Sequence, residues 1–183
     1  MGIKTLKFMS KKIMFNDKYR LTEAVLDGRK TQTRRIAKGA NATKENARYK
    51  VGEVVAIAQR YSDIEDFLPF DRNFDIERGG KERSGWNNKM FVKAIYMPHH
   101  IRITDVRIER LQDISYEDCI AEGITRVKVI RDYSELGTYS YDGIPYGCLT
   151  AKIAFSDLID KISGKGTWDA NPFVYVYEFE LVD

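Results

Sequence analysis

The segment LTEAVLDGRKTQTRR, residues 21–35, decides the local fold around which the rest of the chain is interpreted. Its first part places Leu21, Ala24 and Val25 at helical spacing, and Gly28 follows where helices commonly end in a left-handed residue. The threonines after Gly28 favour a strand or an extended loop, because β-branched side chains fit a pleated surface. The segment therefore predicts a short helix that stops abruptly and is followed by a basic, extended stretch.

Strands and short helices alternate irregularly along the rest of the chain. Apolar residues alternate at Ile101 and Ile103 and resume at Val106 and Ile108, so a one-residue slip at Asp105 predicts a β-bulge. We expect further strands at residues 53–58 and 173–182, and helices at residues 115–123 and 151–162. Because there is no βαβ rhythm, the pattern predicts an α+β protein with a small mixed β-barrel rather than a parallel sheet.

Two stretches interrupt this pattern. Residues 60–90 are polar, charged and broken by proline and glycine, and they are too long for a simple connection in a compact domain. Residues 125–148 are rich in tyrosine and glycine. We therefore expect a single domain over residues 1–183, with short flanking helices and two irregular excursions from the core.

Composition excludes several classes of protein. Hydrophobic residues make up 43% of the chain and aromatic residues 12%, which excludes a wholly disordered chain. No apolar run approaches the ~20 residues that cross a bilayer, so we expect no membrane partner. The first residues lack the pattern of a signal peptide, and the two cysteines, Cys119 and Cys148, are too few for a disulfide framework. We therefore expect a cytoplasmic protein with reduced thiols.

A local basic cluster stands out although the net charge is only +3. Five cations fall within ten residues that contain no acidic side chain: Arg29, Lys30, Arg34, Arg35 and Lys38. Such a cluster can neutralise phosphates even when the overall charge balance is mild. A solvated basic face remains the alternative on the charges alone.

Four stretches together resemble a known family. In chain order they are LTEAVLDGRKTQTRR, YKVGEVVAI, ITDVRIERLQDISYEDCIAEGI and GKGTWDANPFVYVYEFELV. They resemble the ASCH-domain proteins of bacteria and their phages, and the most specific motif is Gly-x-Lys-x-x-x-x-Arg, present as Gly28, Lys30 and Arg35. The resemblance implies a PUA-like β-barrel whose basic cleft binds RNA or a modified nucleoside. It implies no cofactor.

One branch of that family resembles a small amidohydrolase that removes the acetyl group from N4-acetylcytidine. The resemblance implies a catalytic set of Lys30, Thr33 and Glu122, with Glu117 as a possible substitute for Glu122. Amide hydrolysis needs a nucleophile, a base and a proton donor for the leaving nitrogen. We expect Lys30 to be the base for Thr33, Glu122 to donate the proton, and Arg35 or a backbone N–H to hold the oxyanion. Direct attack by water, with Lys30 or Glu122 as base, fits the same residues.

Other residues are candidates for binding. The candidates for RNA or substrate contact are Arg29, Arg34, Arg35, Lys38 and Trp168. Trp168 lies in a turn rich in glycine, where packing is the alternative to stacking on a base. The histidines and cysteines lack the spacing of metal ligands, so we expect no metal site. A non-catalytic RNA-binding module of a phage or prophage is the alternative function.

Overall fold

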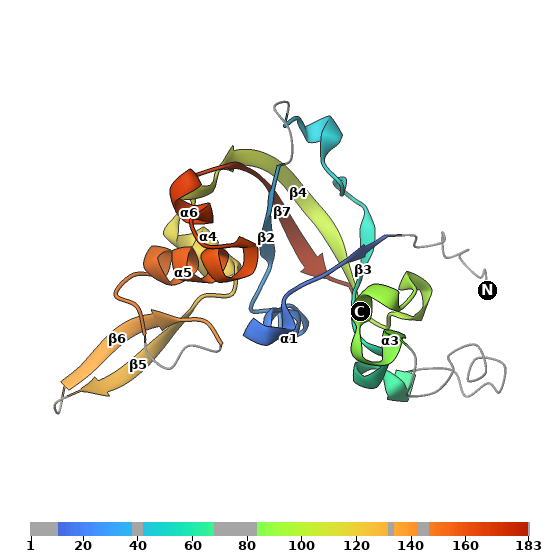
Figure 1. Ribbon diagram of the computed structural model, residues 1–183, viewed down its shortest axis with the longest axis horizontal. Helices are drawn as coiled ribbons and strands as arrows, with labels where there is room; N and C mark the ends of the chain where they lie inside the picture. Colours follow the sequence, from blue (N-terminus) through green and yellow to red (C-terminus); the bar gives the residue numbers. More distant parts are fainter. Residues whose placement is uncertain (1–10, 38–41, 68–83, 132–133, 143–146, 183) are drawn as a thin grey trace. The chain divides into compact units, whose positions relative to one another are not determined.

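The computed structural model describes residues 11–37, 42–67, 84–131, 134–142 and 147–182, with the backbone alone at residues 129–131 and 134–136 (Figure 1). A mixed five-stranded sheet has the strand order β1-β3-β4-β7-β2, and its strands are β1 (Lys12–Ile13), β2 (Gln32–Ile36), β3 (Val54–Ile57), β4 (His100–Arg110) and β7 (Phe173–Leu181). A second sheet pairs β5 (Thr125–Arg131) with β6 (Ser134–Ser140). The α+β class is confirmed. The hydrogen-bonded order runs from β1 to β2 without returning to its start, so it does not describe a closed barrel.

Short helices connect the strands. The α-helices are α1 (Leu21–Leu26), α3 (Ser84–Asn87), α4 (Tyr116–Ala121), α5 (Ala151–Ser163) and α6 (Thr167–Ala170). Single 3-10 turns are η1 (Asp17–Tyr19), η2 (Lys44–Asn46), η3 (Tyr61–Asp63), η4 (Glu65–Phe67), η6 (Lys89–Phe91), η7 (Ala94–Tyr96) and η8 (Leu111–Asp113). Among the described residues, no helix has both the length and the apolar character needed to cross a membrane.

The chain divides into two compact units. One comprises Met1–Phe15, Val54–Arg102 and Leu181–Asp183, and the other comprises Asn16–Glu53 and Ile103–Glu180. Strand β4 begins in the first unit and continues into the second. All the predicted site residues belong to the second unit.

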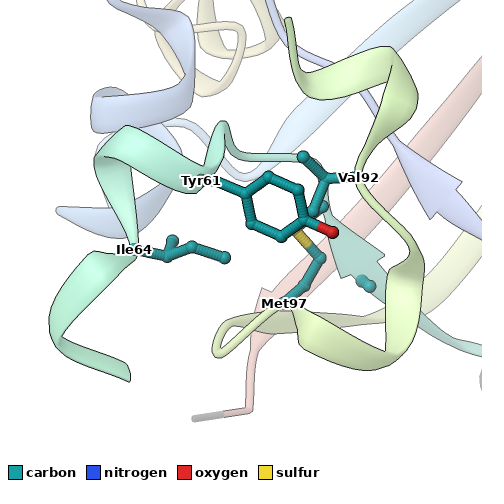
Figure 2. Close-up of a cluster of buried hydrophobic side chains, with 5 residues drawn as sticks. Tyr61, Ile64, Val92 and Met97 are labelled. Carbon is teal, nitrogen blue, oxygen red and sulfur yellow. The ribbon is translucent and has the colours of Figure 1, made fainter. Parts of the chain in front are cut away.

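The first unit has its own small apolar core (Figure 2). Its buried residues are Ala56, Tyr61, Ile64, Val92 and Met97. Trp86, Ala94 and Tyr96 pack against this cluster. The described ends of the predicted excursion at residues 60–90 are therefore short helical turns folded around a core, while residues 68–83 lie outside the described residues.

In the second unit, the helices form where the sequence pattern predicts them. Leu21, Ala24 and Val25 are the buried residues of α1, because spacing of three and four residues places them on one helical face. Helix α4 begins after Ser115, whose hydroxyl accepts a hydrogen bond from the backbone N–H of Asp118. Helix α5 buries Ala151, Ala154, Phe155, Leu158 and Ile159, as expected of its amphipathic sequence.

Strands β4 and β2 carry residues of the candidate site. In β4, Ile101, Ile103 and Val106 are buried, so the buried phase shifts by one residue near Asp105 as predicted. Strand β2 pairs antiparallel with β7, with Thr33 opposite Tyr177 in the register.

The excursion predicted at residues 125–148 is not irregular in its first half. Strands β5 and β6 form an antiparallel hairpin, drawn in orange in Figure 1. The tyrosine and glycine content obscured the alternation in TRVKVIR, where β-branched residues are separated by cations. Residues 143–146 lie outside the described residues.

Candidate functional site

The loop after α1 fixes the backbone of Lys30. Gly28 has φ +72°, the left-handed conformation that ends α1, and its N–H donates to the carbonyl of Val25. The Lys30 N–H then donates to the carbonyl of Ala24 at 2.8 Å, while the next N–H, that of Thr31, donates to α4. The loop is therefore held between the end of one helix and the end of another.

Lys30 and Glu122 form a buried ion pair although 92 residues separate them in sequence. The Lys30 Nζ donates to Glu122 Oε2 at 2.5 Å and to the backbone carbonyl of Glu122 at 2.8 Å. Lys30 is 2% exposed and Glu122 is 5% exposed. Burial lowers the pKa of Lys30, and the Glu122 carboxylate offsets part of that effect. Two members of the predicted catalytic set, Lys30 and Glu122, are therefore in contact, while Glu117 is exposed.

Gly123 lies next to the Lys30 side chain. It follows Glu122 with φ +100°, a conformation that a residue with a side chain adopts only with strain. A Cβ atom at this position would lie 3.6 Å from the Cβ of Lys30. The glycine that was predicted to end the helix therefore also forms part of the wall around Lys30.

Arg34 holds the other side of the Glu122 carboxylate. Its Nη1 donates to Glu122 Oε1 at 3.2 Å, and its Nη2 donates to Asp118 at 2.7 Å and to Glu109 at 2.6 Å. Burial lowers the pKa of Arg34, but the surrounding carboxylates have the larger combined effect, so its pKa is raised. Arg34 is 5% exposed, so it has almost no surface to offer to a phosphate. Its hydrogen bonds position Glu122 and the other carboxylates around it, and the contact of Arg34 with RNA stays a prediction.

The ion-pair network continues outward from Arg34. Arg107 donates to Asp118 at 2.8 Å and to Glu109 at 3.1 Å, and it also forms an ion pair with Glu178. Gln32 donates to Asp118 and Glu178, at 3.0 and 3.2 Å. Each carboxylate thus has more than one donor, which keeps the charges around Glu122 in a fixed arrangement.

Sequence reasoning missed this outer part of the network. Arg107 and Glu109 alternate with Val106 and Ile108 along β4, and that alternation was a signal that both lie on one polar face. The carboxylate of Asp118 in α4 was not predicted to bind the strand cations.

Thr33 lies on the opposite face of β2 from Arg34, because neighbouring strand residues point to opposite faces. It is 5% exposed and stands opposite Tyr177 in the register. Among the residues that the structure describes, the Thr33 hydroxyl has no hydrogen-bond partner, so no hydrogen bond joins it to Lys30. The structure therefore assembles Lys30 with Glu122 but does not bring Thr33 into that hydrogen-bonded group.

Aromatic and basic residues share the face of the sheet on which Thr33 lies. Tyr177, opposite Thr33, packs edge-on against Tyr49, with ring centroids 5.2 Å apart, and its ring lies 6.2 Å from that of Tyr175. Arg35 shares this face, opposite Tyr175 in the register, and burial lowers its pKa. The charge of Arg35 also lowers the pKa of Lys30.

The remaining predicted binding residues have different surroundings. Arg29 is partly exposed and forms ion pairs with Asp27 at 3.1 Å and with Asp142 at 3.8 Å. Trp168 lies on α6 with its ring edge-on to Phe155 of α5, which favours the packing alternative. Lys38 lies outside the described residues. Within the described part of the chain, no group of three or more potential ligands could hold a metal ion.

Comparison with known proteins adds little to this geometry. No family model matches the sequence, and no curated protein does. The crystal structure of protein EF3133 from Enterococcus faecalis V583, described under family model DUF984, is similar over 97% of this chain and 84% of that chain. The identity is 16% and the TM-score is 0.47, which is too low to support an argument about fold or function.

Proposed function

We propose that this chain is an ASCH-type protein with a PUA-like fold that binds RNA or a modified nucleoside and hydrolyses the amide of an N4-acylated cytidine. The observation that carries the proposal is the buried contact between Lys30 Nζ and the Glu122 carboxylate. These are two of the three residues to which the family resemblance points, and they come from distant parts of the sequence. Under this proposal the protein works in the cytoplasm.

Lys30 is suited to move a proton during amide hydrolysis. Since burial lowers its pKa, Lys30 holds its proton less tightly than an exposed lysine does. Lys30 rests as the ammonium paired with Glu122, and its lowered pKa makes the neutral form more accessible. The neutral form takes the proton from the attacking hydroxyl, and the resulting ammonium returns it to the leaving cytidine nitrogen. The amide C–N bond breaks, water supplies the oxygen of the released acid, and Lys30 ends in its starting state.

Glu122 has a different role from the one expected from sequence. Its two carboxylate oxygens accept hydrogen bonds from Lys30 and from Arg34. Such a carboxylate is an acceptor, so it stabilises the ammonium form of Lys30 instead of donating a proton to the leaving group. Arg34 keeps the carboxylate oriented, as an aspartate orients the histidine of a hydrolytic triad.

Two nucleophiles fit this arrangement. The Thr33 hydroxyl would give a covalent acyl-enzyme, while water would give direct hydrolysis. Thr33 has no hydrogen bond to Lys30 among the described residues, so attack by Thr33 needs a substrate-induced approach. Arg35 lies on the same face as Thr33 and supplies the positive charge that an oxyanion requires.

The test is release of cytidine from N4-acetylcytidine by the full chain. Turnover should be lost in Lys30→Met and Glu122→Gln, because each removes one half of the proton-transferring pair. Lys165→Met is the matched control, since it makes the same change at an exposed lysine. Thr33→Val separates the two nucleophiles, because only attack by Thr33 requires the hydroxyl. Intact turnover in both Lys30→Met and Glu122→Gln would refute the proposed roles.

A non-catalytic RNA-binding module is the second candidate function. It is favoured by the absence of a hydrogen bond between Thr33 and Lys30 and by exposed cations such as Arg29. A module that contacts several phosphates loses RNA affinity steeply as salt rises, whereas turnover of a neutral nucleoside responds little. Strongly salt-dependent RNA binding without any turnover of N4-acylcytidines would select this second function.

A further inference from the structure

The β5–β6 hairpin presents a basic and aromatic face that the candidate site does not use. Arg126 stands opposite Tyr139 in the register, and Lys128 stands opposite Gly137, so these four residues share one face of the hairpin. Arg126 and Lys128 are exposed. The other face carries Thr138, which is buried, and Val127, whose backbone carbonyl accepts a hydrogen bond from the Thr138 hydroxyl.

The Arg126 guanidinium lies close to Gly137. A Cβ atom at position 137 would lie 2.9 Å from the Nη2 of Arg126 and 3.1 Å from its Nε, so a side chain there would displace the guanidinium. Arg126 is exposed, and an exposed guanidinium can stack on a nucleobase.

Two tyrosines extend the same surface. Tyr139 packs edge-on against Tyr116 of α4, with ring centroids 5.7 Å apart. Tyr116 is 50% exposed. Cations next to partly exposed rings are the combination with which proteins bind single-stranded nucleic acid, since phosphates meet the cations and bases stack on the rings.

Both ends of the hairpin are attached to the candidate site. Strand β5 begins three residues after Glu122, and Asp142, just after β6, forms an ion pair with Arg29 at 3.8 Å. Arg29 precedes Lys30 in the loop after α1. The two ends of the hairpin are therefore joined to the segments that carry Lys30 and Glu122.

We infer that the face formed by Arg126, Lys128, Tyr139 and Tyr116 binds single-stranded RNA that carries the target nucleotide to the Lys30–Glu122 pair. This inference rests on the proposed function and deepens it: the substrate is a nucleotide within an RNA strand, and a free nucleoside occupies only part of the binding surface. The hairpin supplies phosphate contacts and base stacking, while the site itself acts on one base.

The test measures binding of a fluorescent 12-nucleotide single-stranded RNA to the full chain by anisotropy, over a series of salt concentrations. Removing two phosphate contacts in Arg126→Gln/Lys128→Gln should reduce the slope of log affinity against log salt by about 1.4, since each contact contributes about 0.7 for a single strand. The matched control is Lys44→Gln/Lys165→Gln, which makes the same charge change at exposed lysines elsewhere and should leave the slope unchanged.

Two further variants test the geometry without changing the charge. Gly137→Ala should weaken RNA binding several-fold, because the added methyl group displaces the Arg126 guanidinium. Tyr139→Leu should weaken it about tenfold through the loss of stacking. Thermal melting by circular dichroism identifies any variant that fails to fold.

Turnover of free N4-acetylcytidine by the same proteins separates this inference from the proposed function. The hairpin variants should keep wild-type turnover of the free nucleoside while they lose RNA affinity. Normal turnover by the wild type, with equal salt slopes in the hairpin double variant and its control, overturns the inference and leaves the proposed function standing. Failure of the wild-type chain to bind the RNA at low salt overturns the inference whatever the turnover result.

Discussion

Replacing Glu122 with glutamine removes the negative charge that faces Lys30 while keeping the shape of the side chain. Lys30 is 2% exposed, so its ammonium cannot turn to water when the carboxylate is lost. Removing one partner of a buried ion pair costs roughly 3–5 kcal/mol, because the remaining charge is left uncompensated. The Glu122 backbone carbonyl still accepts from Lys30 at 2.8 Å. We therefore expect a loss near the lower limit, about 3 kcal/mol in the free energy of unfolding.

Urea unfolding followed by tryptophan fluorescence measures this loss. For a chain of this length, about 3 kcal/mol corresponds to a fall of roughly 6–12 °C in the melting temperature. The control is Glu23→Gln, which breaks the exposed Arg20–Glu23 pair and should cost less than about 1 kcal/mol. The double variant Lys30→Met/Glu122→Gln should be less destabilised than the sum of its single variants, since it leaves no buried charge at the pair.

The pH dependence provides a second measurement of the same effect. Burial already lowers the pKa of Lys30, and loss of Glu122 lowers it further because the carboxylate was opposing that shift. Between the lowered pKa and the usual value of 10.5, the unfolded chain binds more protons at this lysine, so stability rises with pH. The difference in free energy of unfolding between wild type and Glu122→Gln should thus be largest near neutral pH and become smaller toward pH 10.5. A deficit equal to that of Glu23→Gln, or one independent of pH, would refute the assignment of a charged, buried Lys30.

Arg34→Lys keeps the charge but loses the planar group that donates to several carboxylates, so we expect a destabilisation of about 2–4 kcal/mol in urea unfolding; a loss under about 1 kcal/mol would contradict the role of its hydrogen-bond geometry. Gly123→Ala and Gly28→Ala both force a side chain into a positive φ, at a cost of about 1–2 kcal/mol each. Only Gly123→Ala should also reduce turnover, since its methyl group lies against Lys30. Burial and its hydrogen bond to Asp157 raise the pKa of Tyr141 to about 12. Because the folded chain then keeps a proton that the unfolded chain releases near pH 10, stability should fall between pH 10 and 12 in wild type and less so in Tyr141→Phe, as measured by urea unfolding.

Local patterns predicted the elements that carry the site. Helix α1, the glycine that ends it and the long strand β7 follow from spacing and β-branching within a few residues, and each is present. The contact of Lys30 with Glu122 came from the family resemblance, because no local rule relates two residues 92 positions apart. The hairpin at β5 and β6 was missed since its tyrosines and glycines matched the composition of a loop.

The roles of the arginines could not be predicted from charge alone. Arg29, Arg34 and Arg35 are neighbours in one basic run, yet their surroundings differ completely. The alternation of β2 turns Arg34 toward the carboxylates of β4 and α4 and turns Arg35 toward the tyrosine face. Whether an arginine is buried and paired depends on the residues of the elements that face it, and those residues lie elsewhere in the sequence.

A buried lysine beside a carboxylate stays charged only if the carboxylate itself is kept in place. If nothing else held the Glu122 carboxylate, it could move in a region of low dielectric. There a small displacement changes how far its attraction for the ammonium offsets the cost of burying that charge. Arg34 prevents that displacement by bonding the second Glu122 oxygen, while Asp118 and Glu109 hold Arg34 in turn. The network therefore sets how readily Lys30 releases its proton. Under the proposed function, the basicity of this proton carrier is determined in part by residues that the substrate does not contact.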